Sequence, residues 1–127
     1  MTIEHFIKTE KVNNVSDIKS ILNKKTEKGV NEFIISLDSP YPYIIISVNG
    51  NKACLSYFRY DDDPGFHSIN NAVKSYENGI TIFYTNTEDE EIEVENCAIV
   101  TIEQAVKAVE EFFLTEQLPK CIEWEEL

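Results

Sequence analysis

The fold of this chain is decided by residues 101–127, which read TIEQAVKAVEEFFLTEQLPKCIEWEEL. Apolar side chains recur there at intervals of three and four residues, which places them on one stripe of an amphipathic helix: Ile102, Ala105, Val106, Val109, Phe112 and Phe113. Thr101 and Gln104 match a capping box, in which each side chain accepts the backbone amide of the other residue. The pattern predicts a helix over about residues 102–116 with one buried face.

Pro119 marks the end of that helix, because proline lacks an amide hydrogen and disfavours the helical conformation of the residue before it. A short strand is predicted for residues 121–124, with Ile122 and Trp124 on the same side. The apolar stripe of the helix needs a sheet to pack against, and the strand that carries the single tryptophan closes the chain.

A second helix is predicted over about residues 16–27, with Val15, Ile18, Ile21 and Leu22 as its apolar stripe. Ser16 is its expected cap and Gly29 its expected end. The strands expected from apolar runs and alternation are residues 3–12, 32–38, 43–48, 52–60, 80–85 and 90–100, whereas residues 69–79 are expected to form a loop.

The segment 43–48 is almost wholly apolar, which is typical of a central strand covered on both faces. In segment 32–38, Phe33 alternates with Glu32, so the two should occupy opposite faces of a half-buried strand. Asn49-Gly50 is the strongest hairpin signal and suits a type I′ turn. We expect one α+β domain over residues 1–127, a mostly antiparallel sheet of about five to seven strands with two packed helices.

A chain of 127 residues with fourteen aromatic side chains can form a real core without disulfides or metals. The sequence has no long apolar run and no secretory signal pattern, which predicts a cytoplasmic protein that does not enter membranes. Cys54, Cys97 and Cys121 are widely spaced and lie in strand-like apolar contexts, so we expect reduced core residues rather than catalytic or metal-binding thiols.

The net charge of −12 is distributed unevenly. Residues 1–30 hold six basic residues against four acidic ones, whereas residues 31–127 hold five basic residues against nineteen acidic ones. Such an acidic surface disfavours direct binding of nucleic acid and favours a basic partner. Solubility alone is the simpler explanation of the charge.

Acidic and aromatic side chains concentrate between residues 57 and 95, and this region holds the candidate contact residues for a basic partner: Tyr60, Asp61, Asp62, Asp63, Phe66, His67, Tyr76, Glu88, Asp89, Glu90, Glu91, Glu93 and Glu95. Two structural alternatives are core packing of the aromatic residues and protection of an exposed strand edge by the glutamates. The three consecutive aspartates lack the alternate spacing and the distal glutamate of a calcium loop, so no metal or cofactor is expected.

His67 is followed by Ser68, and this pair, or His67 with an aspartate, defines the alternative of a small hydrolase. No nucleophile elbow, zinc motif or phosphate loop accompanies them. We therefore expect a structural or interface histidine and a protein that is not an enzyme.

The end of the chain resembles a known family at Phe112, Phe113, Thr115, Gln117, Pro119, Trp124, Glu126 and Leu127. These residues are similar to the tail of the bacterial immunity proteins associated with deaminase toxins in polymorphic toxin systems, including those that act against double-stranded-DNA cytidine deaminases. Phe112, Phe113, Pro119 and Trp124 would form the structural family motif.

The resemblance implies a non-enzymatic cytoplasmic antidote that binds a cognate toxin domain and occludes its active site. The acidic balance fits independently, because an enzyme acting on DNA or RNA carries a basic substrate groove. Another possibility is an acidic binding module that inhibits a different nucleic-acid enzyme.

Overall fold

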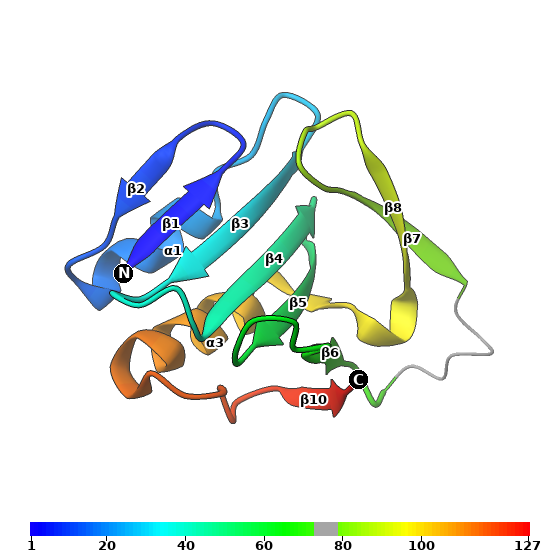
Figure 1. Cartoon of the computed structure of the whole chain (residues 1–127). Coiled ribbons are helices and arrows are strands. Elements are labelled where there is room, and N and C mark those ends of the chain that lie inside the picture. The colour runs from blue at the N-terminus through cyan, green and yellow to red at the C-terminus, as the bar shows by residue number, and fades with distance from the viewer. Residues whose placement is uncertain (73–78) are drawn as a thin grey trace.

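A computed structural model of the chain describes residues 1–72 and 79–127 and shows an α+β fold with two α-helices and ten strands in that part of the chain (Figure 1). The main sheet is antiparallel, and its order is β10-β6-β5-β4-β3-β1-β2, with β9 paired to β5. Its strands are β1 (Thr2–His5), β2 (Thr9–Lys11), β3 (Val30–Ser36), β4 (Tyr43–Asn49), β5 (Lys52–Phe58), β6 (Phe66–Ile69), β9 (Val100–Thr101) and β10 (Glu123–Glu126). A separate two-stranded sheet contains β7 (Ile80–Tyr84) and β8 (Glu91–Glu95).

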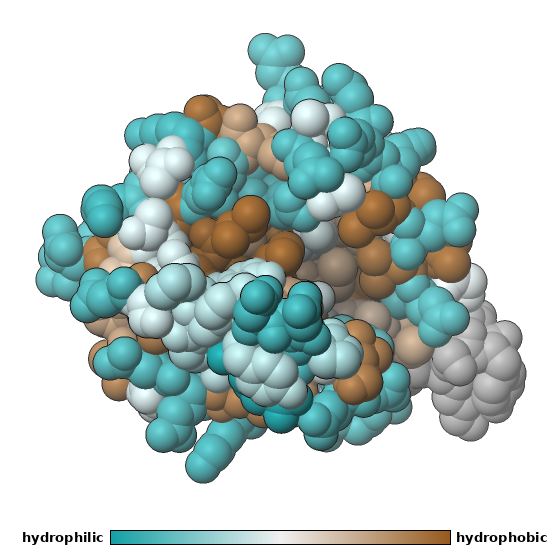
Figure 2. Space-filling view, in the orientation of Figure 1, coloured by the Kyte–Doolittle hydropathy of each residue, from teal (hydrophilic) through white to brown (hydrophobic). Residues whose placement is uncertain are grey.

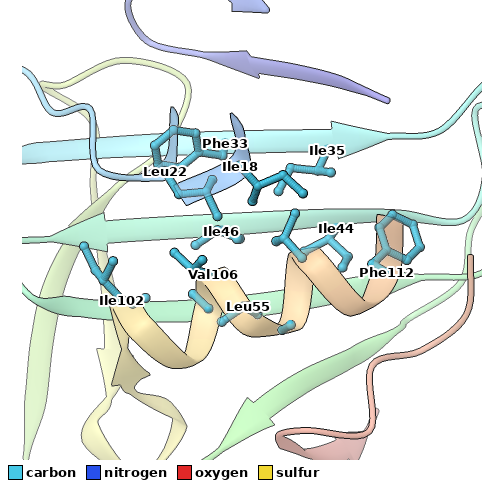
Figure 3. Close-up of a cluster of buried hydrophobic side chains, with 14 of the residues drawn as sticks. Ile18, Leu22, Phe33, Ile35, Ile44, Ile46, Leu55, Ile102, Val106 and Phe112 are labelled. Carbon is cyan, nitrogen blue, oxygen red and sulfur yellow. The ribbon is translucent and has the colours of Figure 1, made fainter. Parts of the chain in front are cut away.

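Helix α3 (Ile102–Thr115) confirms the prediction from the C-terminal stretch. Thr101 and Gln104 form the complete capping box, and Glu116 ends the helix in the left-handed conformation. The apolar stripe packs on one face of the main sheet, where Phe112 and Val106 lie near the side chains of β4 and β5 (Figure 3). This layer is the hydrophobic core, because alternate side chains of the central strands point into it.

Helix α1 (Ile18–Leu22) is shorter than predicted, and a 3₁₀ turn over Val15–Asp17 precedes it. Ser16 lies inside that turn rather than at a helix cap, and the helix ends at Leu22 instead of continuing to Gly29. The reason is that the apolar stripe stops at Leu22: the polar residues that follow have no face to bury, so packing cannot extend the helix.

The hairpin between β4 and β5 lies where it was predicted, but its turn is shifted by one residue. Asn49 pairs with Lys52, which leaves Gly50 and Asn51 as the two turn residues. Gly50 has a φ of 61°, whereas Asn51 is not among the positive-φ residues of the described chain. A glycine at the first turn position with this pattern is typical of type II′ rather than the predicted type I′.

Other predicted boundaries also differ. The segment 3–12 is two strands, β1 and β2, and the segment 90–100 is β8 followed by a 3₁₀ turn (Asn96–Ala98) and β9. Strand β6 was not predicted, because its four residues are too few to show a pattern. The strand pairs instead with β5 and with β10, which is distant in the sequence. The final strand is displaced by two residues from the predicted 121–124.

Candidate protein-binding surface

Both helices cover one face of the main sheet, and no described helix covers the opposite face (Figure 1). We call the accessible part of this face, around Ile34, Tyr43, Ile45 and Phe58, the open face; the part at Glu32 and Ser47 is buried. On this open face, Ile34 of β3 lies beside Ile45 of β4 in the strand register and remains 36% exposed. Tyr43 and Phe58 are paired across β4 and β5 with stacked rings 4.9 Å apart. Figure 2 shows apolar residues in a hollow at the middle of this face, surrounded by hydrophilic ones.

The open face corrects the prediction for residues 43–48. Their apolar run suggested a strand covered on both sides, yet Ile45 and Tyr43 are only half-buried. The run therefore supplies the core with one set of side chains and an accessible surface with the other. Sequence reasoning missed this surface because apolar residues on two faces of a strand look the same whether a second layer covers them or not.

The acidic hairpin β7–β8 borders the open face (Figure 1). Phe83 of β7 is fully buried beneath it, so the other face of the hairpin points outward. On that outer face the register places each glutamate of β8 directly opposite an apolar residue of β7, in the pairs Ile80–Glu95, Ile82–Glu93 and Tyr84–Glu91. Ile80 is 49% exposed and the three glutamates are exposed. An apolar row and a carboxylate row thus run side by side.

Contacts to β3 and β4 hold the hairpin in place. Glu32 of β3, expected on a solvated face, is only 8% exposed. Its carboxylate accepts hydrogen bonds from Thr85 Oγ1 at 2.8 Å and from the Asn86 amide at 3.0 Å. Asn49 Nδ2 donates to the carbonyl of Ile82 at 2.9 Å. The strand pattern could not reveal these contacts, because the partners are more than thirty residues away.

The loop after β5 carries Asp61, Asp62 and Asp63, which have different environments. Asp61 and Asp62 are exposed, and the hydroxyl of Tyr41 donates to Asp61 at 3.3 Å. Asp63 is buried, and its carboxylate accepts bonds from the backbone amide, Nε and Nη2 of Arg59 at 2.8–2.9 Å. The Arg59 guanidinium holds the pKa of Asp63 well below its usual range. Asp63 therefore shapes the loop, and only its two neighbours are accessible.

The Asp63 contacts should make stability depend on pH. Because the folded-state pKa lies below the unfolded value of about 3.9, the stabilisation is complete above that value and is lost as pH falls through the lower folded pKa. We expect wild type to melt above Asp63→Asn at neutral pH, with the gap closing below about pH 4, as thermal unfolding at a series of pH values would measure. Asp62→Asn is the matched exposed control, and a gap that persists at low pH would contradict the assignment.

Because Phe66–Ile69 is a strand, the side chains of His67 and Ser68 lie on opposite faces of the sheet. His67 Nε2 lies 3.1 Å from Glu125 on β10. Ser68 is fully buried, where its hydroxyl donates to the Ala98 carbonyl at 2.7 Å and accepts the Leu55 amide at 3.0 Å. Successive residues of a strand point to opposite faces, so these two side chains cannot act together. The geometry gives the hydrolase alternative with Ser68 as nucleophile no support.

The cysteines offer no activated thiol. All three are free; Cys121 is exposed and the other two are half-buried, so none of them is the core residue that was predicted. Burial raises the pKa of Cys54 to about 11, and burial beside Glu95 and Glu111 raises the pKa of Cys97 and Cys121, respectively. Thiols with raised pKa values stay protonated and are poor nucleophiles.

The described ranges contain no cluster of three or more His, Cys, Asp or Glu side chains placed to bind a metal. Within the same ranges, no helix is long and apolar enough to cross a membrane.

The predicted contact residues fall into two groups at opposite ends of β4. Tyr60, 54% exposed, and the neighbouring Asp61 and Asp62 follow β5 where it pairs with the start of β4. The hairpin with Glu88, Asp89, Glu90, Glu91, Glu93 and Glu95 contacts β4 at Asn49, its last residue. A seven-residue strand spans roughly 20 Å. Two acidic patches thus flank one apolar surface.

The remaining candidates do not join these patches as free contacts. Phe66 is half-buried under the Arg59 guanidinium, 4.8 Å from its ring, and His67 is paired with Glu125. Asp89 belongs to the hairpin patch, but its carboxylate already forms an ion pair with Lys28 of the segment between α1 and β3. Tyr76 lies outside the described residues.

Comparison with known proteins gives two matches. The model of a family described as immunity protein Imm1 matches residues 11–126. A double-stranded DNA deaminase immunity protein of Burkholderia cenocepacia (strain H111) is 26% identical over 117 residues, which cover 91% of each chain. The family match extends over the open face, the hairpin and the C-terminal helix and strand.

Proposed function

The chain belongs to the Imm1 family of immunity proteins, and from this premise we propose that it neutralises a cognate deaminase toxin by covering the toxin's active site. The deaminase class is supported by the curated relative, which is an immunity protein against a double-stranded DNA deaminase. The protein acts in this proposal as a stoichiometric inhibitor in the cytoplasm, not as an enzyme, and it contacts the toxin rather than nucleic acid.

The observation that carries the proposal is the pairing of an accessible apolar sheet face with two acidic patches at its ends. A deaminase that acts on nucleic acid needs a basic groove for the phosphate backbone. The net charge of −14 over residues 31–127 would attract such a groove and speed the encounter. Apolar and aromatic side chains between the patches would then supply buried contact area, as the centre of a stable interface requires.

The contact residues in this proposal come from both patches and the surface between them. The hairpin would contribute Glu91, Glu93 and Glu95 together with Ile80 and Tyr84, and the loop after β5 would contribute Tyr60, Asp61 and Asp62. Ile34, Ile45, Tyr43 and Phe58 would form the centre. Glutamates beside apolar side chains can pair with arginine or lysine while the hydrocarbon parts of those cations pack on the neighbouring row.

Co-expression with the toxin domain encoded beside this gene tests the proposal. We expect growth to be restored, and we expect the two purified proteins to form a one-to-one complex in which the toxin no longer deaminates its substrate. The complex should weaken as salt rises, because screening reduces charge attraction. A catalytically inactive toxin variant should bind equally well, since the proposed contacts do not require turnover.

Several outcomes would contradict the proposal. A host that dies despite expression of this protein, with no complex recovered, would refute neutralisation. A complex that leaves the toxin's deamination rate unchanged would refute coverage of the active site. Equal inhibition of unrelated nucleic-acid enzymes would favour the general acidic module instead. The deaminase toxin of the Burkholderia relative is the specificity control and should bind more weakly than the cognate one.

A further inference from the structure

The hairpin β7–β8 is attached to the rest of the molecule differently from every other pair of strands that the structure describes. Its strands hydrogen-bond to each other but not to the main sheet. Its position therefore depends on buried Phe83, on the side-chain hydrogen bonds of Glu32 and Asn49, and on the ion pair of Asp89 with Lys28. An isolated two-stranded hairpin is at best marginally stable in water, so these attachments decide where its acidic face points.

Glu32 contacts the hairpin with both oxygens of its carboxylate. One carboxylate oxygen accepts the Thr85 hydroxyl at 2.8 Å, and the other accepts the Asn86 amide at 3.0 Å. Both donors lie where β7 ends and the turn to β8 begins, and Asn86 itself adopts the left-handed conformation with a φ of 64°. A two-oxygen contact to adjacent residues fixes both the position and the direction of the turn.

The chemistry of Glu32 suits this role. The side chain is 8% exposed, and a carboxylate held away from water is costly unless hydrogen bonds compensate for the lost hydration. Moving the hairpin away would leave the Asn86 amide and the Thr85 hydroxyl to find new acceptors. The bonds to a charged acceptor are also stronger than bonds between neutral groups.

We propose that Glu32 is a positioning residue for toxin binding: it does not touch the toxin, and it locks the acidic hairpin in the orientation that binds. This inference rests on the proposed function, because it assumes that the hairpin contacts the toxin. A preorganised contact surface loses less conformational entropy on association, so locking the hairpin increases affinity without adding a contact.

Amide hydrogen exchange of the free protein tests, without any toxin, whether Glu32 holds the hairpin in place. In Glu32→Gln, we expect the amides of Asn86 and of the β7–β8 ladder to exchange about tenfold or more faster, as loss of a bond to a charged acceptor implies. Amides of β3, β4 and β5 should change far less, because their ladder is intact. Thr85→Val, which removes one donor, should have the same local effect, and Thr85→Ser, which keeps the hydroxyl, should behave as wild type.

Affinity for the cognate toxin domain, measured on the same variants by calorimetry, tests the consequence. Glu32→Gln and Thr85→Val should bind about tenfold more weakly, whereas Thr85→Ser should retain wild-type affinity. Glu103→Gln removes the same charge from an exposed position on helix α3, on the other side of the main sheet, and controls for net charge. Glu93→Gln should weaken binding while leaving hairpin exchange unchanged, because Glu93 is a contact residue and not part of the lock.

The two measurements separate the possible failures. Unchanged hairpin exchange in Glu32→Gln, or acceleration spread evenly over all strands, would overturn the lock. Faster hairpin exchange with unaltered affinity would overturn its role in binding. If the wild-type protein does not bind the toxin, the proposed function is refuted. The exchange measurement would still show whether Glu32 holds the hairpin in place.

Discussion

Replacement of Glu91, Glu93 and Glu95 together by lysine is expected to weaken toxin binding by about a hundredfold or more and to abolish protection of the host. The three side chains are exposed on the outer face of the hairpin, in one row beside Ile80, Ile82 and Tyr84. The change converts three negative charges into three positive ones, which a basic groove would repel. Calorimetry of the purified complex and a growth assay measure the two effects.

The control is a second triple variant, in which lysine replaces Glu103, Glu110 and Glu116 on the helix side. It has the same change in net charge. It should bind and protect nearly as wild type does, apart from a general reduction in electrostatic attraction. Both variants should be checked by thermal unfolding. If the β8 variant binds normally but aggregates, the glutamates protect the edge of the hairpin and do not contact the toxin.

Trp124→Ala is expected to lower the free energy of unfolding by about 3 kcal/mol, at the lower end of the range for large aromatic residues because the side chain is only partly buried. The indole ring lies 6.1 Å from the Tyr57 ring on the core side of the sheet, and its Nε1 donates to the Pro119 carbonyl at 2.7 Å. Urea denaturation followed by circular dichroism measures the loss.

Trp124→Phe separates the two contributions, because it keeps most of the ring contact and removes the hydrogen bond. It should cost about 1 kcal/mol, the usual worth of one such bond. Neutralisation should survive both substitutions at temperatures where the variants are folded. An unchanged melting temperature combined with lost toxin binding would instead make Trp124 an interface anchor.

Sequence reasoning succeeded where the responsible interactions are local. The stripe from Ile102 to Phe113 and the capping box between Thr101 and Gln104 depend on residues three or four positions apart, so α3 could be placed almost to the residue. The hairpin after Asn49 was found for the same reason, although its turn type depended on the strand register. The resemblance of the tail pointed correctly to the family.

The candidate surface could be predicted only in part. The exposed glutamates of β8 followed from strict alternation, and the exposed Asp61 and Asp62 from a loop composition. Two other acidic residues, Asp63 next to Asp62 and Glu32 in β3, proved to be buried. Their environments depend on Arg59 within a tight loop and on Thr85 and Asn86 from a distant turn, and a pattern of residue types does not specify such partners.

The amino-acid sequence by itself determined the α+β class, the C-terminal helix, the acidic character of the surface and the family. These properties follow from short-range periodicity, capping and net charge, which act along the chain. The tertiary structure alone decided that part of one face of the central sheet stays open, that two acidic patches flank this part, and that Glu32 anchors the hairpin beside it. The physical reason is that burial and hydrogen bonding depend on which residues distant in the sequence meet in the folded chain, and no local pattern specifies these pairs.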